Sequence, residues 1–383
     1  MDFREPEELL LLRETARRLT DEVFRPKAAH WDRTTEAPVE NLRHLARHGL
    51  AGITIEERFG GAGGSVVHAV AAIEEVARGC TATAAFILAN CVSAEILQAM
   101  GSEAQKQRYL PGLAEGRFVG AWAMTEADAG SAATELRTRA RADGNGHYLL
   151  DGTKQFITRA GVAGFFIVFA RLGDTPGARG VTAFIVDRDT PGLSLGRRDV
   201  HMGLRGGASA EVVLRECRVP ADSMLLPPGQ FGRLMNGLNQ ARVLNPGMCL
   251  GIADEALRLA TLHVQTRRQF GQALADFQGL QWMLADMAVK VDAMRLLIYR
   301  AAAQLAAGHP DGAHNAAIAK AYSGEAAFEV VDAAMQLHGG YGYSSELPLE
   351  RMLRDVRAFK IGGGSTQIMK NRIASGLFRR NPA

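Results

Sequence analysis

The chain has 383 residues, enough for two or three domains of ordinary size. Hydrophobic residues make up 47% and charged residues 22%, as in an ordinary globular protein, so extended disorder is excluded. Lys and Arg number 44 against 41 Asp and Glu, a balance that gives no electrostatic reason to bind nucleic acid or an anionic membrane.

Residues 1–120 have the pattern of a helical domain, with almost no strand signal. Apolar residues recur at helical spacing, and the glycine run Gly60–Gly64 interrupts them. The polar start of the chain does not resemble a signal peptide, and no window reaches about 18 consecutive apolar residues. We expect helices at Glu7–Phe24, Val39–His48, His68–Ala77, Thr83–Met100 and Glu103–Leu113.

Residues 121–232 predict a β domain instead. Short apolar runs alternate with clusters of Gly, Pro and Asp, and Asp143–Gly146 is typical of a hairpin turn. Strands at this spacing favour a small barrel or sandwich. The expected strands lie at Thr138–Ala142, His147–Gly152, Phe165–Ala170, Val181–Val186, Leu193–Leu195 and Glu211–Leu214.

Residues 233–383 return to the helical pattern, which predicts a bundle. Pro246 lies early in its first segment and marks either a kink or a first turn. The fold class is therefore α+β, with a helical domain, a β domain and a helical bundle in that order. The expected helices are Arg242–Gln265, Phe277–Ala307, Ala313–Leu337 and Leu347–Val356.

The four cysteines, at positions 80, 91, 217 and 249, are widely spaced and include no C-x-x-C pair. This spacing favours neither a zinc site nor a disulfide framework, so we expect a protein of the reducing cytoplasm without a metal. Walker and G-x-G-x-x-G nucleotide motifs are also missing from the sequence.

The segment Ala121–Ser131 is the most informative for chemistry. Strand alternation places Trp122 and Met124 on one face, where they could lie against a flat ring. The turn at Gly130 and Ser131 presents backbone N–H groups that suit a phosphate. On these residues alone, a plain strand ending in a turn is the favoured interpretation of the segment.

Several motifs in one order resemble the acyl-CoA dehydrogenase family across nearly the whole chain. Thr125–Ser131 and Asp151–Thr158 resemble its flavin-binding strands. Arg267–Gly271 is similar to its R-x-x-F-G motif, Gln336–Tyr343 to its Q-x-x-G-G-x-G run, and Ile361–Ile368 to its C-terminal motif. The resemblance implies a C-terminal four-helix bundle, and an FAD-dependent oxidoreductase that exchanges hydride between Cβ of an acyl thioester and flavin N5.

The resemblance also implies which residues contact the cofactor and substrate. In this family FAD lies between subunits, so one set of residues serves the chain's own FAD and a second set serves that of a neighbour. The first set is Trp122, Met124, Thr125, Gly130, Ser131, Phe156, Thr158, Ser365 and Gln367, and the second is Arg267, Gln269, Phe270, Gln278, Gln336, Gly339 and Gly340. The substrate residues are Ser131, Asn239, Arg242 and Gly364.

The implied partners are an acyl-CoA or acyl-carrier-protein substrate, an electron-transfer flavoprotein if the enzyme oxidises, and further copies of the chain in a homotetramer or homodimer. Asn239 stands where the family often has an Asp that contacts pantetheine, which leaves a carrier-protein substrate open. The glycines Gly362–Gly364 predict a widened pocket for a branched, polar or bulky acyl group.

The sequence departs from the family at the catalytic base. The family's Glu stands at one of two positions, which here are Gly363 and Ala241, and neither residue can accept a proton. The catalytic residue is therefore unassigned. Four explanations remain: a displaced carboxylate, the reverse reduction, a monooxygenase or hydroxylase of the same fold, or a non-catalytic flavin-binding subunit of a mixed oligomer.

Overall fold

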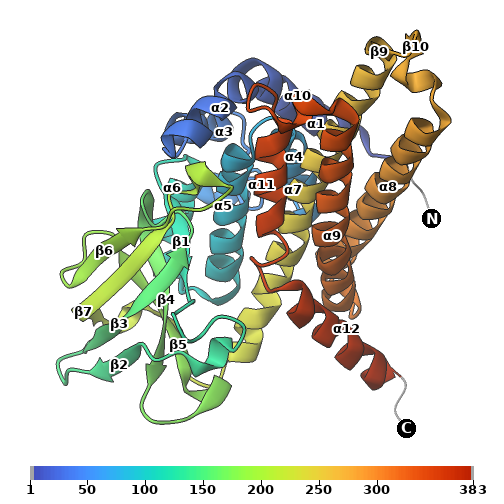
Figure 1. Ribbon diagram of the computed structural model, residues 1–383. Helices are drawn as coiled ribbons and strands as arrows, with labels where there is room; N and C mark the ends of the chain where they lie inside the picture. Colours follow the sequence, from blue (N-terminus) through green and yellow to red (C-terminus); the bar gives the residue numbers. More distant parts are fainter. Residues whose placement is uncertain (1–3, 381–383) are drawn as a thin grey trace.

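The computed structural model describes residues 4–380, apart from the side chains of residues 236–238 and 380. A helical body, a sheet and a second helical body follow one another along the chain (Figure 1). The predicted order of domains is confirmed. The boundaries after residues 120 and 232 stay predictions, because strand β1 (Val119–Ala123) and helix α7 (Phe231–Thr266) cross them.

The first body is helical, as its apolar spacing predicts. Side-chain caps fix two helix starts: Ser65 and His68 form a capping box at one, and Ser102 and Gln105 form one at the other. The helices are α1 (Glu7–Leu19), a π-helical turn (Thr20–Phe24), α2 (Arg25–Thr34), α3 (Val39–Arg47), α4 (Val66–Ala77), α5 (Thr81–Met100) and α6 (Glu103–Ala114).

Helix α5 is long and apolar enough to cross a membrane by length and composition. In the structure 61% of that apolar window is buried, and α5 packs against α4 and α7. The apolar side chains of α5 therefore form part of the protein core.

The middle body is one eight-stranded sheet, mostly antiparallel, with the order β6-β7-β3-β2-β4-β5-β8 and β1 paired parallel to β4. The predicted hairpin is confirmed, since Asp143–Gly146 joins two antiparallel strands. The strands β3 and β7 are longer than expected. Beyond β1, the strands are β2 (Arg139–Ala142), β3 (His147–Ile157), β4 (Ala163–Leu172), β5 (Val181–Asp187), β6 (Leu193–Arg198), β7 (Ala210–Pro220) and β8 (Met224–Leu226).

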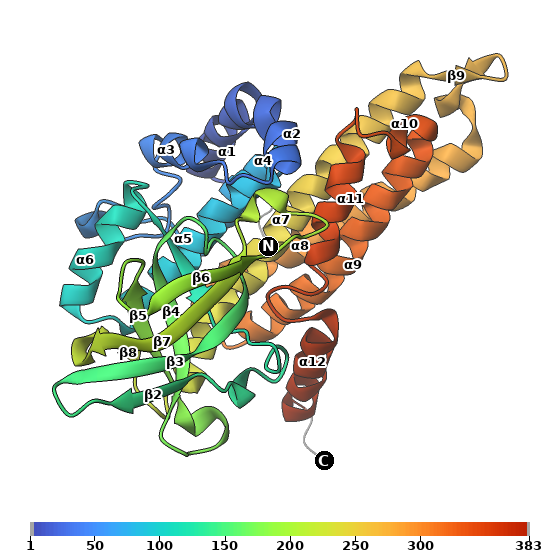
Figure 2. The same ribbon diagram turned by 60° about the vertical axis from the view of Figure 1, so that its left-hand side comes forward.

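The third body is built around α7, which packs against α9, α8, α4 and α5. A short hairpin of β9 (Arg268–Gln269) and β10 (Gln272–Ala273) joins α7 to α8 and projects from the end of the bundle (Figure 2). The remaining helices are α8 (Gln278–Ala306), α9 (Gly312–His338), α10 (Gly340–Tyr343), α11 (Leu349–Ala358) and α12 (Thr366–Arg380).

The structure differs from the sequence expectations at several points. Helix α7 begins at Phe231 rather than Arg242, and it passes through Pro246 without ending there. Tertiary packing on four other helices compensates for the hydrogen bond that proline removes. Helices α2 and α12 were not expected, and the first strand begins at Val119, within the segment predicted to be helical.

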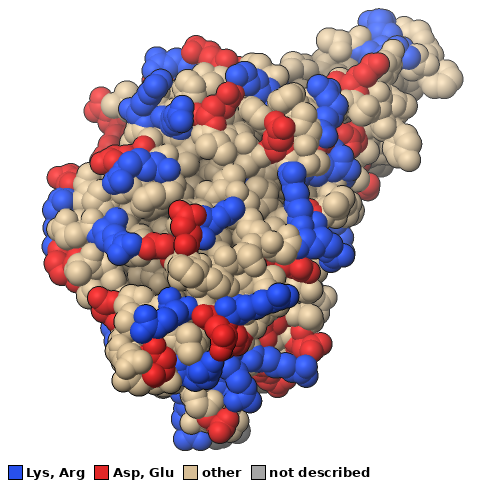
Figure 3. All heavy atoms as spheres, turned by 90° about the vertical axis from the view of Figure 1, so that its left-hand side faces the viewer, with Lys and Arg blue, Asp and Glu red and all other residues tan. Residues whose placement is uncertain are grey.

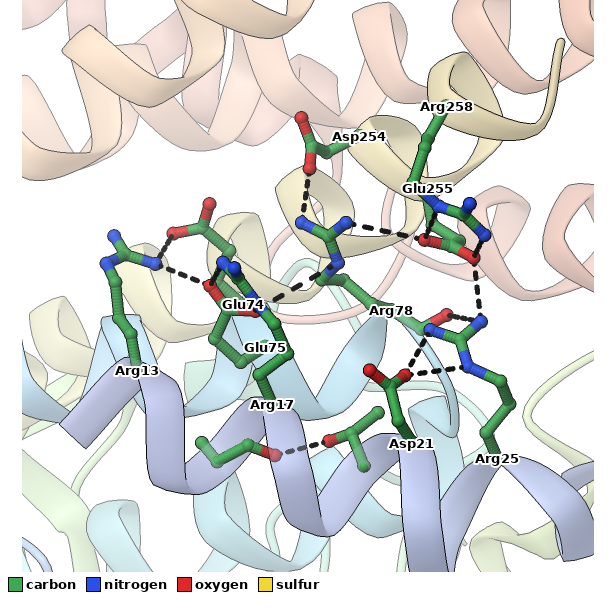
Figure 4. A network of polar contacts seen from close by, with 12 residues as sticks. Arg13, Arg17, Asp21, Arg25, Glu74, Glu75, Arg78, Asp254, Glu255 and Arg258 are labelled. Carbon is green, nitrogen blue, oxygen red and sulfur yellow. Dashed lines mark hydrogen bonds and ion pairs between the residues drawn. The ribbon is translucent and has the colours of Figure 1, made fainter. Parts of the chain in front are cut away.

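A network of buried ion pairs holds the first helical body against the bundle (Figure 4). The Glu255 carboxylate on α7 is fully buried and pairs with Arg25, Arg78 and Arg258. Burial opposes its charge, but these guanidinium groups hold the pKa of Glu255 below its usual range. Helices α2 and α7 and the end of α4 are thereby joined by one charge-compensated group.

Replacing Glu255 with Gln should lower the free energy of unfolding by about 3 kcal/mol, because three guanidinium groups lose their shared carboxylate. Thermal or urea unfolding at neutral pH measures the loss. The depressed pKa means that this contribution is complete above the unfolded-state pKa and disappears as the pH falls through the folded one. The difference between wild type and variant should therefore shrink in acid. Asp21→Asn, in an exposed pair, should change stability by less than about 1 kcal/mol.

The surface carries both signs of charge. Figure 3 shows Lys and Arg interspersed with Asp and Glu over the face formed by the sheet and the first helical body. This pattern agrees with the small net charge of +3 and offers no extended electrostatic binding face on that side.

Candidate active site

A buried ion pair fixes the segment that follows β1. The Lys154 ammonium on β3 donates to Glu126 Oε1 at 2.7 Å and to the Met124 carbonyl at 3.3 Å. Glu126 also accepts the backbone N–H of Arg137 at 2.5 Å and that of Thr138 at 2.9 Å. Burial opposes both charges, but Lys154 and these hydrogen bonds hold the pKa of Glu126 below its usual range. Glu126 is thus a positioning group.

This scaffold brings one group of predicted flavin residues together. Gln155 N–H donates to the Thr125 carbonyl at 2.9 Å, so the end of β3 lies beside the end of β1. Phe156 has a φ of 57° and is 56% exposed, an unusual conformation and exposure for a phenylalanine. Trp122 and Met124 are half-buried, and Thr125 and Thr158 add hydroxyl groups.

These residues fit the isoalloxazine ring of FAD. An exposed aromatic face beside half-buried aromatic and thioether groups suits a flat ring, and the hydroxyls suit its polar edge. The predicted phosphate contacts, Gly130 and Ser131, are exposed in the turn that follows Glu126 and Ala129. A Cβ added at Gly130 would meet nothing within 4 Å, so open space lies beside this turn.

A second group of predicted residues lies elsewhere, at the end of the bundle that carries β9 and β10 (Figures 1 and 2). There the rings of His263 and His338 stack at 4.2 Å, joining the ends of α7 and α9. Phe270 is 93% exposed and has a φ of 54°. The seven residues of this group, Arg267, Gln269, Phe270, Gln278, Gln336, Gly339 and Gly340, are all exposed. Within one chain the structure does not bring them to the sheet.

The loop between α11 and α12 faces α7 at Gly363 and Ala241, the two positions that the sequence predicts for the family's base. Gly363 has a φ of 71°, and a Cβ placed there would lie 3.0 Å from Asn245 Nδ2. The same Asn245 amide donates to the Ala241 carbonyl at 2.8 Å, one helical turn earlier. Asn245 therefore lies between the two positions, a contact that sequence reasoning missed.

The expectation of a widened pocket at Gly362–Gly364 needs correction for two of its three residues. Asn245 lies close to Gly363, and a Cβ at Gly364 would lie 2.7 Å from Met369 Cε. Neighbouring side chains therefore limit the space that the missing side chains leave. In the same loop Ser365 is half-buried, with its hydroxyl accepting the N–H of Ile368, and Gln367 is exposed.

The two predicted substrate residues on α7, the cation Arg242 and the amide Asn239, are both buried. Arg242 is 4% exposed and donates to Asn239 Oδ1, while its Nε has no hydrogen-bond partner among the described residues. Lys320 on α9 is 2% exposed and donates to the Gly364 carbonyl. Burial lowers the pKa of each, to about 10 for Arg242 and about 8 for Lys320. Sequence reasoning missed Lys320, because only the fold brings α9 to this loop.

The comparisons with known proteins cover the full length. The sequence matches the acyl-CoA dehydrogenase N-terminal domain over residues 6–117, the middle domain over 121–217 and the C-terminal domain over 231–378. A short-chain specific acyl-CoA dehydrogenase of Clostridium acetobutylicum is 36% identical over 381 residues, covering 99% of this chain and 100% of the relative.

Solved structures agree in fold. Butyryl-CoA dehydrogenase from Megasphaera elsdenii has a TM-score of 0.96 to this chain and 33% identity, covering 99% of this chain and 100% of that one. A structure of PigA with FAD and proline has a TM-score of 0.93 at 27% identity and covers 100% of both chains.

The fold and the site define a flavoprotein oxidoreductase. The chain belongs to the acyl-CoA dehydrogenase family, whose three domains it matches in order. It is an FAD-dependent enzyme that acts on the CH–CH group of an acyl thioester. The predicted family, fold class, enzyme class and cofactor are confirmed.

Glu126→Gln should lower the melting temperature and weaken FAD retention, because it leaves the Lys154 charge uncompensated and loosens the segment that carries Met124 and Thr125. The FAD-to-protein absorbance ratio after gel filtration measures retention. Asp128→Asn, an exposed change two residues away, is the control and should retain FAD. Full FAD retention in Glu126→Gln would contradict the positioning role of the pair.

Proposed function

We propose that this enzyme works on the Cα–Cβ bond of an acyl thioester without a carboxylate of its own at either usual base position. Two observations together support this proposal. The residues that fit the isoalloxazine ring, which we call the flavin platform, are present, and Asn245 lies between Gly363 and Ala241. When bound, FAD supplies a hydride acceptor for Cβ. Trp122, Met124, Thr125, Phe156 and Thr158 hold the ring in this proposal, and Ser365 and Gln367 contact it from the C-terminal loop.

Asn239, Arg242 and Gly364 line the acyl end of the substrate in this proposal, and Ser131 lies towards its carrier. The Asn245 amide faces the reacting carbons in place of a carboxylate. An amide donates and accepts hydrogen bonds but does not remove a proton near neutral pH, so a saturated acyl-CoA without an acidifying or leaving group is a poor substrate.

The β9–β10 end of the bundle serves the FAD of a neighbouring chain in this proposal. Arg267 pairs with the pyrophosphate, and Gly339 and Gly340 permit close approach of backbone. Support comes from the exposure of that group and from an apolar stripe on α8 at seven-residue spacing, where Trp282 is 63%, Val289 68% and Leu296 50% exposed. We therefore propose a homotetramer or homodimer, in the cytoplasm, with an electron-transfer flavoprotein as redox partner.

Placing a carboxylate at position 241 should create a dehydrogenase of simple acyl-CoA. Ala241 lies on α7, where Glu needs no unusual backbone. We expect Ala241→Glu to raise the anaerobic rate of FAD reduction by butyryl-CoA at least about a hundredfold, the scale of general base catalysis. Stopped-flow absorbance measures that rate.

Two controls sharpen this experiment. Ala241→Gln has the same shape without a base and should give no gain. Gly363→Glu should also give little or none, because a φ of 71° and the 3.0 Å approach to Asn245 oppose any side chain there. Equal rates for Ala241→Glu and Ala241→Gln would contradict the proposal that only the base is missing.

Val289→Arg should separate the subunits and release FAD, because it places a charge in the centre of the α8 stripe. Light scattering measures the mass and absorbance measures bound FAD. Glu14→Arg, an exposed change in the first helical body, should alter neither. A Val289→Arg variant that is monomeric yet fully loaded with FAD would overturn the shared site.

A further inference from the structure

Two buried cations lie beside the two positions where the family has its carboxylate. Arg242 follows Ala241 directly on α7, and Lys320 reaches the carbonyl of Gly364, which follows Gly363. Both side chains are more than nine-tenths buried. Four elements converge here, α7, α9, the α11–α12 loop and α12, and they bring two positive charges to one place.

These charges have no compensating anion among the residues that the structure describes. Arg242 bonds to the neutral Asn239, its Nε is unpartnered, and Lys320 bonds to a carbonyl. Burial lowers the pKa of Lys320, and the nearby charge of Arg242 lowers it further. Burial also lowers the pKa of Arg242, and the charge of Arg372 on α12 lowers it further.

The acidic group that interacts with Lys320 is the Cys249 thiol. Burial raises its pKa to about 12, despite the opposing charge of Lys320, so it stays neutral. Taking two cations out of water costs several kcal/mol unless an anion pairs with them. Arg159 is also buried without a carboxylate partner, but it is a single charge held by two carbonyls and the Phe86 ring. Here two cations lie together, the described residues supply no anion, and the ligand is the source that remains.

We propose that the substrate is a 2-carboxyacyl thioester, whose own carboxylate occupies the place of the missing glutamate and pairs with Arg242 beside Lys320. This inference rests on the proposed function and names its substrate class. The carboxylate enters from the side of Gly363, which is exposed and has no side chain, past the Asn245 amide.

A carboxylate on Cα also removes the need for a base. The bond between Cα and the carboxylate breaks, CO₂ leaves, and the bonding electron pair stays on Cα. That pair forms the Cα=Cβ bond as a hydride leaves Cβ for FAD, so the substrate loses CO₂ and two electrons and no proton has to be abstracted. One feature of the substrate thus explains both the unpaired cations and the missing glutamate.

The first test is a pair of ligands that differ only in the carboxylate. Calorimetric titration of the holoenzyme should show ethylmalonyl-CoA binding about ten- to a hundredfold more tightly than butyryl-CoA, the value of one charge-assisted pair. Turnover of ethylmalonyl-CoA should release one CO₂ for each crotonyl-CoA formed. Equal affinities, or crotonyl-CoA formed without CO₂, would overturn the inference and leave the proposed function intact.

Variants on α7 extend this test. Arg242→Gln should abolish the preference for ethylmalonyl-CoA, whereas Arg233→Gln, an exposed arginine on the same helix, should keep it. Ala241→Glu places a second carboxylate at the same point and should reverse the preference by repulsion. The Ala241→Glu result tests the inference even if the Arg242→Gln variant fails to fold. An unchanged preference in Ala241→Glu would overturn the inference. Failure of the wild type to bind either thioester would overturn the proposed function as well.

Discussion

A charge removed from water has to be compensated, and this constraint organises the whole molecule. The Glu255 carboxylate has no exposed surface, and three arginines from three helices surround it. The Glu126 carboxylate is paired with Lys154 and two backbone N–H groups. In both cases compensation joins segments that are apart in sequence: the Glu255 network holds the two helical bodies together, and the Glu126 network fixes two segments of the middle body.

Arg242 and Lys320 do not follow this rule, and neither does the fully buried Arg159, which bonds to two carbonyls and lies over the Phe86 ring. Arg242 and Lys320 differ from Arg159 because two cations lie together there. They lie where α7, α9 and the α11–α12 loop converge, beside the residues that replace the family's glutamate. Structural ion pairs elsewhere are complete within one chain, whereas the positive charge here is complete only with a ligand. The loss of a carboxylate from the protein and the demand for one in the substrate are then two aspects of one change.

The flavin platform shows how local strain and buried charge cooperate. Phe156 keeps a left-handed backbone at the end of β3, and the Glu126–Lys154 pair fixes the neighbouring end of β1. Together they hold aromatic and hydroxyl groups at one edge of the sheet. The second group of predicted cofactor residues lies at the far end of the bundle, so the proposed cofactor site needs residues that one chain keeps apart.

The amino-acid sequence was enough to predict the order of helical, sheet and helical domains, because hydrophobic periods of 3.6 and 2 residues are local patterns. It also determined the family, through motifs in a fixed order, and the absence of glutamate at positions 241 and 363. The sequence did not predict that Asn245 lies between those positions or that Lys320 reaches Gly364, since these contacts join α7, α9 and a distant loop and depend on the fold. The course of α7 through Pro246 likewise depended on packing, which overrides local preference when enough apolar surface is buried.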